Sequence, residues 1–289
     1  MQHPIYVSSG AFIGRVNGRS PSPFLQIAPS LLCDGFECML YEAWYDRLDE
    51  VIEQFAMSKL SFPVLHVEKS IGTVIGVGES GYRKTALDLF EKNCQAAKRL
   101  SARTLVFHLW NGLASDHHFD RHLEICGEFL SMAEDYGLCL TVENVVCAEG
   151  SPLAHLLALS EAYPTLAFTF DTKMASFHRE LALAFDAPYR QLWHSIKHLH
   201  VNDHGGAYHD FSGLRTLHIG DGHIDFESFF EKLSEVGYHG GITLECTSMC
   251  EDGSLTPEKM AASIEKVRAY LKQQGQVKER QKMQSDEKN

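Results

Sequence analysis

The chain has 289 residues, of which 44% are hydrophobic and 22% are charged, as is common in globular enzymes. Its 26 basic and 38 acidic residues give a net charge of −12, which argues against a nucleic-acid partner. No apolar stretch approaches the roughly 20 residues that span a bilayer, and the amino terminus lacks the features of a secretion signal. With eight cysteines that show no framework spacing, these features predict a cytoplasmic protein with reduced thiols and no membrane association.

Strand-like and helix-like segments alternate along the chain. Apolar runs predict strands at 4–12, 36–42, 62–68, 103–109, 138–144, 166–171, 196–202 and 241–246. Between them, helical patterns occupy 44–59, 84–100, 117–136, 152–162, 178–194 and 225–236, and 256–274 closes the chain. Eight such units in sequence predict an α/β fold, a single (β/α)8 TIM barrel, because parallel strands need crossover connections.

Three segments have weaker patterns. Prolines within 20–34 confine any helix there to a first turn. The segment 69–83 contains four glycines and is predicted to be a loop, either a lid over the barrel mouth or a plain mobile connection. We expect the barrel to occupy residues 1–274, and the polar tail 275–289, which lacks an apolar stripe, to be disordered.

Four of the predicted strands end in a residue that can bind a metal. The runs LCLTVEN, LAFTFD, IKHLHVND and GITLEC carry, in this order, Glu143, Asp171, His200 and Glu245. Each residue alone has a structural alternative, since strand-end carboxylates cap helices and single histidines are often structural. The carboxyl ends of barrel strands meet at one face, however, where three carboxylates would repel one another without a cation. The pattern predicts a divalent metal, Mn²⁺, Co²⁺, Zn²⁺ or Mg²⁺, with no organic cofactor.

Two further histidines end the third and fourth predicted strands. His66 lies in FPVLHVEKS and His108 in TLVFHLWNG. They could complete a second metal site beside Glu143, bind substrate hydroxyls, or simply line a wet cavity.

The segments TVEN, FTFD, HLHVND, HIGDGHIDF and GITLE resemble the xylose-isomerase-like barrel superfamily over about residues 4–272. That group contains sugar isomerases and epimerases, related dehydratases and abasic-site nucleases of the endonuclease IV type. In the isomerase and epimerase branch, Glu, Asp, His and Glu hold one divalent metal. The resemblance implies that Glu143, Asp171, His200 and Glu245 do so here.

The resemblance to the nuclease branch is partial. His66 and His108 match histidines that hold an additional zinc there together with the Glu143 position. The third zinc of that branch needs ligands where this chain has Met174, Leu214 and Thr216, and the nearby His178 and His218 are out of register. Many relatives also use a histidine at the Met174 position to contact substrate. The candidates for substrate binding that remain are listed here: Trp110, Lys173, Arg215 and His218.

These residues predict a divalent-metal-dependent isomerase or epimerase of a sugar or sugar phosphate. We expect Glu143 and Glu245 to be both metal ligands and the acid/base pair, acting through a metal-stabilised enediolate. A dehydratase of the same fold, an abasic-DNA phosphodiesterase and a barrel that only binds a sugar are the alternatives. The expected partner is a small carbohydrate, and the sequence is compatible with a homo-oligomer although no interface is legible.

Overall fold

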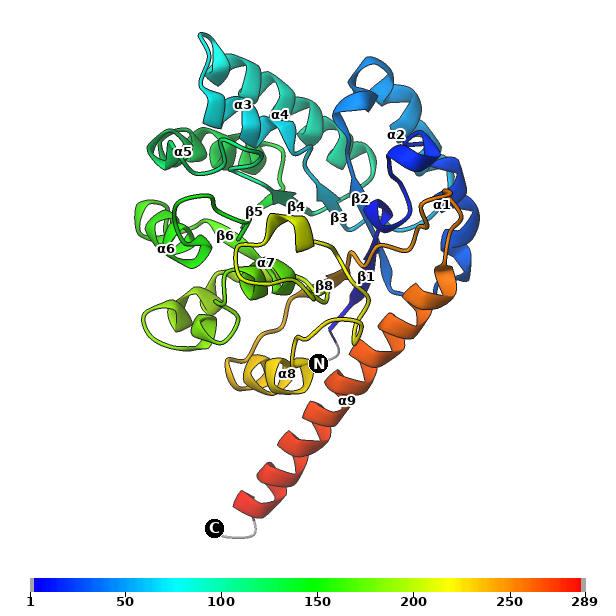
Figure 1. Cartoon of the computed structure of the whole chain (residues 1–289), viewed down its shortest axis with the longest axis vertical. Coiled ribbons are helices and arrows are strands. Elements are labelled where there is room, and N and C mark those ends of the chain that lie inside the picture. Colours follow the sequence, from blue (N-terminus) through cyan, green and yellow to red (C-terminus); the bar gives the residue numbers. More distant parts are fainter. Residues whose placement is uncertain (1–2, 287–289) are drawn as a thin grey trace.

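Eight parallel strands close into a barrel in which each strand pairs with the next and β8 pairs with β1 (Figure 1). The computed structural model describes residues 3–286, and the surroundings of side chains up to residue 276. The strands are β1 (Ile5–Ser8), β2 (Gly35–Met39), β3 (Val64–His66), β4 (Thr104–Phe107), β5 (Cys139–Glu143), β6 (Ala167–Asp171), β7 (Ile196–His200) and β8 (Gly241–Leu244). The predicted TIM barrel is confirmed: seven strands lie inside their expected ranges, and β2 begins one residue before its range.

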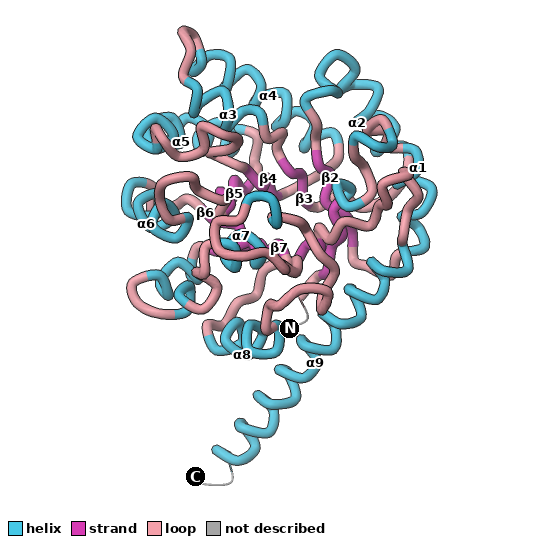
Figure 2. Tube along the Cα trace, in the orientation of Figure 1, coloured by secondary structure: helices cyan, strands magenta, loops and turns pink. Residues whose placement is uncertain are grey.

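Helices surround the strands, as Figure 2 shows by their cyan ring around the magenta barrel. They are α1 (Ser22–Ile27), α2 (Leu48–Met57), α3 (Ser70–Val77), α4 (Tyr82–Arg99), α5 (Phe119–Asp135), α6 (Pro152–Ala162), α7 (Thr172–Phe177), α8 (Phe226–Glu235) and α9 (Pro257–Asp286). Within residues 3–286, none of these helices is both long and apolar enough to cross a membrane. All eight cysteines are free thiols.

Alternate residues of each strand face either the helices or the barrel interior, because side chains of a strand alternate between its two faces. In β5, Leu140 and Val142 join the hydrophobic core between sheet and helices, whereas Thr141 and Glu143 belong to the buried polar set. The inward Thr141 contacts Thr169 of β6 with 2.7 Å between the hydroxyl oxygens. The interior of this barrel is therefore polar toward its carboxyl end, while the apolar core lies outside it.

The predicted helix 178–194 is wrong. The chain instead forms α7 directly after β6, because the Asp171 carboxylate accepts the N–H of Met174 and caps a helix there. Two short 3-10 turns follow, Leu183–Phe185 and Tyr189–His194. Pro188 lies between them, and a proline removes a helical hydrogen bond and disfavours helical geometry in the residue before it.

The glycine-rich segment 69–83 is not the predicted loop, since it contains α3. Ile71 and Ile75 of this helix are buried. A Cβ at Gly72 would lie 2.5 Å from the carbonyl oxygen of His108, so this glycine lets the helix approach the end of β4. The glycines here serve close packing against the barrel, in addition to the turn at Gly78, where φ is +68°.

The polar tail predicted from 275 onward differs from the structure as well. Helix α9 continues to Asp286, and it extends beyond the barrel in Figure 1, while 287–289 lie outside the described residues. The segment is rich in Gln, Lys, Glu and Arg, which favour helix even without an apolar stripe.

Candidate metal centre

The four residues predicted as metal ligands meet at the carboxyl end of the barrel. Glu143, Asp171, His200 and Glu245 each offer one ligand atom, and these atoms all lie within 4.8 Å of one another. His200 Nδ1 is 3.1 Å from Glu143 Oε1, 3.3 Å from Glu245 Oε2 and 4.0 Å from Asp171 Oδ2. Glu143, Asp171 and His200 are fully buried. The carboxylates of Glu143, Asp171 and Glu245 thus all face the same nitrogen, Nδ1 of His200.

Two asparagines hold the ligands in place. Asn144 lies one residue beyond the end of β5, and Asn202 lies two residues beyond the end of β7. Asn144 accepts the N–H of Asp171 at 2.6 Å and donates to the Asp171 carbonyl at 3.1 Å. Asn202 donates to Asp171 Oδ2 at 3.0 Å and accepts the N–H of Glu245 at 2.8 Å. The ends of β5, β6, β7 and β8 are therefore joined by side chains as well as by the sheet. Asp171 also caps α7, so its structural and ligand roles coexist on different oxygen atoms.

His66 and His108 approach Glu143 from the other side. Glu143 Oε2 lies 2.8 Å from His108 Nε2 and 3.5 Å from His66 Nε2, and the three residues form a second group of potential ligands. His66 Nδ1 lies 2.8 Å from the Val67 carbonyl oxygen, so it donates there and leaves Nε2 directed at Glu143. Glu143 is thus the residue shared by the two groups.

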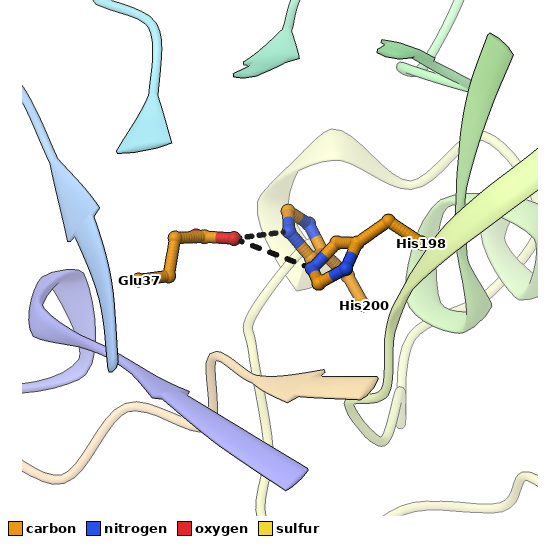
Figure 3. Close-up of side chains that lie close together, drawn as sticks. All are labelled: Glu37, His198 and His200. Atoms are coloured by element: carbon orange, nitrogen blue, oxygen red, sulfur yellow. Dashed lines mark hydrogen bonds and ion pairs between the residues drawn. The ribbon is translucent and has the colours of Figure 1, made fainter. Parts of the chain in front are cut away.

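Glu37 of β2 is a site residue that the sequence analysis missed. Its Oε2 lies 2.9 Å from His200 Nε2 and 3.6 Å from His198 Nε2, and the three side chains point toward one another in Figure 3. The signal was available in the alternation of GFECML, where Phe36 and Cys38 belong to the outer core and Glu37 must face inward. Glu37 lies within its strand, so a search of strand ends does not single it out.

The pKa values show how strongly these groups depend on one another. Burial alone would raise the pKa of Glu143, but His200 and His108 hold it well below its ordinary value. Burial alone would lower the pKa of His200, and Glu245, Glu37 and Glu143 instead raise it well above the usual range. Burial raises the pKa of Asp171 to about 6; Lys173 opposes that rise, and Glu143 and Glu245 add to it.

A cation fits these residues by an independent criterion. Buried polar atoms that lack a hydrogen bond include His66 Nε2 and Glu245 Oε1, and Glu143 Oε2 has only the contact with His108 Nε2 and a longer one with His66 Nε2. An unsatisfied buried carboxylate oxygen is costly, and several around one point are much more so. A divalent ion would satisfy these atoms and offset the repulsion between the carboxylates. The donor set mixes oxygen and nitrogen, which suits the four metals expected from the sequence.

The structure places the four predicted substrate-binding residues in different surroundings. Lys173 lies next to the centre, almost fully buried, with its ammonium donating to Thr216 Oγ1 at 3.0 Å. Arg215 is exposed on the loop that follows β7. Lys173 therefore belongs to the buried surroundings of Asp171, whose pKa burial raises and Lys173 lowers, and Arg215 belongs to the surface of that loop.

Trp110 and His218 are not brought to the centre. Trp110 is fully buried and its indole N–H donates to the Val145 carbonyl at 3.0 Å, so it has no surface for a substrate. His218 lies between Ser263 and Ser248, with its ring nitrogens 3.0 and 3.4 Å from their hydroxyls. Both side chains, which were expected to bind substrate, instead point into packed surroundings that their positions in the sequence do not reveal.

A cavity of about 900 Å³ opens beside the centre, next to the ends of β2, β3 and β4. Its lining includes Tyr41, Lys69 and Asn111. Tyr41 is close enough to Glu245 for that carboxylate to raise the Tyr41 pKa, after the larger effect of burial. None of the clustered ligands lines this cavity, so it adjoins the centre on the side of β2 to β4 and does not contain it.

The fold and the cluster together define a TIM barrel with a metal-type centre at the carboxyl ends of its strands. The family description "Xylose isomerase-like TIM barrel" matches residues 26–273, and the chain therefore belongs to that family.

Individual proteins are more distant. The uncharacterized protein MJ1311 of Methanocaldococcus jannaschii is 29% identical over 174 residues, which span 56% of this chain and 57% of that protein. The structure of a D-tagatose 3-epimerase-like protein superposes with a TM-score of 0.69 at 21% identity, covering 95% of this chain and 99% of that one. An L-ribulose 3-epimerase structure has a TM-score of 0.70 at 15% identity, with 96% and 97% covered. At such identities the structures show that the fold is shared.

Proposed function

We propose that this protein is a divalent-metal-dependent epimerase or isomerase of a sugar or sugar phosphate. The observation that carries the proposal is the buried cluster in which Glu143 and Glu245 flank one nitrogen of His200, at 3.1 and 3.3 Å. The epimerase names of the two superposed structures agree with it, as does the cavity of about 900 Å³ beside the cluster.

Glu143, Asp171, His200 and Glu245 would hold the ion. The bound ion would polarise a substrate carbonyl and the neighbouring hydroxyl and so acidify the adjoining C–H bond. Asp171 and His200 are anchoring ligands, because Asp171 is held by Met174 and Asn202.

Glu143 and Glu245 are the proton-transfer pair. Glu245 keeps a carboxylate oxygen, Oε1, that lacks a hydrogen bond, whereas Oε2 of Glu143 lies 2.8 Å from His108 Nε2. A general base must have such an oxygen available within reach of the substrate proton. Two bases from β5 and β8 can remove a proton from one face of a carbon and return it on the other, which is epimerisation. A single base that moves the proton between adjacent carbons would give isomerisation, and expulsion of a β-hydroxyl would give dehydration.

Elemental analysis combined with proton exchange tests this proposal. We expect about one manganese, cobalt or zinc per chain, and incorporation of deuterium at the carbon next to the carbonyl when ketoses are incubated in deuterated water. Exchange with change of configuration identifies an epimerase, and transfer to the neighbouring carbon identifies an isomerase. A protein that takes up no metal from any of these salts would refute the mechanism and leave a barrel that only binds its ligand.

A zinc phosphodiesterase on abasic DNA is a second candidate, favoured by the His66, His108 and Glu143 group. Against it, the third zinc has no ligand set among the described residues, since Thr216 accepts from Lys173 and His178 is bonded to the Cys147 N–H and His209. Incision of a duplex with one abasic site, together with two or three zinc ions per chain, would favour this function over the first.

A further inference from the structure

His200 has both ring nitrogens in polar contacts, one on each side of the ring. Nδ1 faces Glu143, Asp171 and Glu245, whereas Nε2 lies 2.9 Å from Glu37 Oε2. A neutral imidazole that gives one lone pair to a cation carries its single proton on the other nitrogen. The side of the ring that carries the proton therefore decides which group of carboxylates can hold an ion.

Glu37 is an unusual residue to find inside a barrel. It is fully buried on β2, and its Oε1 has no hydrogen-bond partner. Burying a carboxylate costs free energy that only a nearby donor or cation offsets. Among the described residues, the donors near Glu37 Oε2 are His200 and His198. Both belong to β7, which lies across the barrel from β2, and Figure 3 shows their side chains directed at Glu37.

His198 restrains Glu37 from below. Its Nε2 lies 2.9 Å from the Thr243 hydroxyl of β8 and 3.6 Å from Glu37 Oε2. Residues of β2, β7 and β8 are thus linked inside the barrel, one layer beneath the metal-type cluster. Within residues 3–286, the metal-type ligand that this link reaches by a hydrogen bond is His200.

We propose that Glu37 is a positioning residue that accepts the Nε2–H of His200 and so directs the Nδ1 lone pair to the cation. This rests on the proposed metal centre. A carboxylate that accepts from a ligating imidazole fixes the orientation of the ring and makes the ligand nitrogen more basic. Glu37 also adds negative charge close to the ion without occupying a coordination position.

One competing arrangement uses the same atoms. Glu37, His198 and His200 could themselves hold a cation through Nε2, with the Nδ1–H of His200 donating to Glu143. Three carboxylates surround Nδ1 and one approaches Nε2, so the larger negative charge is on the Nδ1 side. That difference favours the ion among Glu143, Asp171 and Glu245.

The tautomer can be measured directly in the wild-type protein loaded with Zn²⁺, which is diamagnetic. In histidine ¹⁵N–¹H correlation spectra, we expect His200 to carry its proton on Nε2, with Nδ1 shifted by zinc. A spectrum with the proton on Nδ1 and zinc on Nε2 would overturn the proposal, and so would a wild-type protein that binds no zinc.

Two substitutions test the effect on affinity, measured by competition with a chelator for Zn²⁺. Glu37→Leu removes the acceptor, and affinity should fall about 10- to 100-fold, as for other residues that support a ligating histidine. Glu37→Gln retains an oxygen that accepts from Nε2–H, so it should keep the tautomer and restore most of the affinity.

Glu180→Gln is the matched control, because Glu180 is another buried glutamate and bonds to Ser151 and the Leu153 N–H. Its zinc affinity should equal that of the wild type. If Glu37→Leu also binds zinc within twofold of the wild type, Glu37 has no positioning role, while the metal centre and its proposed reaction stand. If the tautomer and the zinc affinities are as expected but the wild type shows no deuterium exchange, the proposed reaction alone is refuted.

Discussion

Two arcs of the barrel mouth are built from the same kind of strand but supply different groups. The ligand arc, β5 to β8, supplies Glu143, Asp171, His200 and Glu245, each as the last strand residue or the one that follows it. The histidine arc, β2 to β4, supplies Glu37, His66 and His108. The ligand arc is rich in carboxylates joined by Asn144 and Asn202, whereas the two histidines of the histidine arc contact one of those carboxylates, that of Glu143.

The difference teaches how the charge of the centre is arranged. Burial lowers the pKa of His108 to about 4, although Glu143 beside it acts in the opposite sense, so this imidazole is neutral at physiological pH. The negative charge is therefore concentrated in the ligand arc and Glu37, while His108 supplies a neutral nitrogen atom. A metal bound mainly by the ligand arc should depend on these two regions very unequally.

The largest effect is expected from Glu245→Gln in the ligand arc. Loss of a charged ligand should reduce metal content well below one ion per chain, and loss of a proton-transfer group should reduce deuterium exchange by about 10²- to 10⁴-fold. Metal content and exchange are measured on the same preparations. Glu251→Gln, an exposed glutamate shortly after β8, serves as control and should match the wild type. Full metal content with full exchange in Glu245→Gln would remove this residue from the site.

A smaller effect is expected from His66→Asn and His108→Asn in the histidine arc. If the arc supports Glu143 without binding its own ion, metal content stays near one per chain and exchange falls about tenfold, in the range seen for supporting residues. Elemental analysis of both variants decides the matter. A change from two zinc ions to one would erase the contrast between the arcs and favour the phosphodiesterase.

The packing behind the histidine arc is tested by Gly72→Ala. The added Cβ would lie 2.5 Å from the His108 carbonyl, so α3 or the end of β4 must move, at a cost of about 1–3 kcal/mol in unfolding free energy. Gly275→Ala is a matched control, because Gly275 is also helical and a Cβ there meets nothing within 4 Å. Chemical denaturation should show the control as stable as the wild type or slightly more so. Equal stability of both variants would contradict the close packing.

The smallest effect concerns His122 of α5, which packs under the loop after β4. Burial lowers its pKa to about 4, and its Nε2 donates to the Ser115 carbonyl at 3.2 Å. The unfolded chain, with an ordinary histidine pKa near 6.5, binds more protons between pH 4 and 6.5, so this residue loses stabilising effect as pH falls through that window.

His122→Gln should reduce that loss. At pH 5.5 the residue accounts for about 1 kcal/mol of the decrease relative to pH 7.5. Denaturation at the two pH values gives the change in unfolding free energy for each protein, and the change in the variant is compared with that in the wild type. An identical pH dependence in the variant would show that His122 is already free to ionise in the folded protein.

The four strand-end ligands could be predicted because each is a polar residue that interrupts an apolar run at its end, as in FTFD, whose last residue is Asp171. Glu37 was missed because it lies within its strand, where only the inward or outward direction shows its role. Trp110 and His218 could not be judged from sequence, since their hydrogen bonds to Val145 and to Ser248 and Ser263 come from distant segments. Helix α3 was missed because Gly72 allows close packing against the end of β4, a distant segment that no local pattern reveals.

The asparagine links between strand ends have a consequence for how the protein is loaded. Asn144 and Asn202 set the spacing of Asp171 and Glu245 through backbone groups, so the distances between ligands follow from the barrel and not from the ion. A binding site of this kind is preorganised before an ion binds. If the proposed ion binds here, exchange of one divalent ion for another would require no refolding, and the ion bound in a cell would reflect which one is available there.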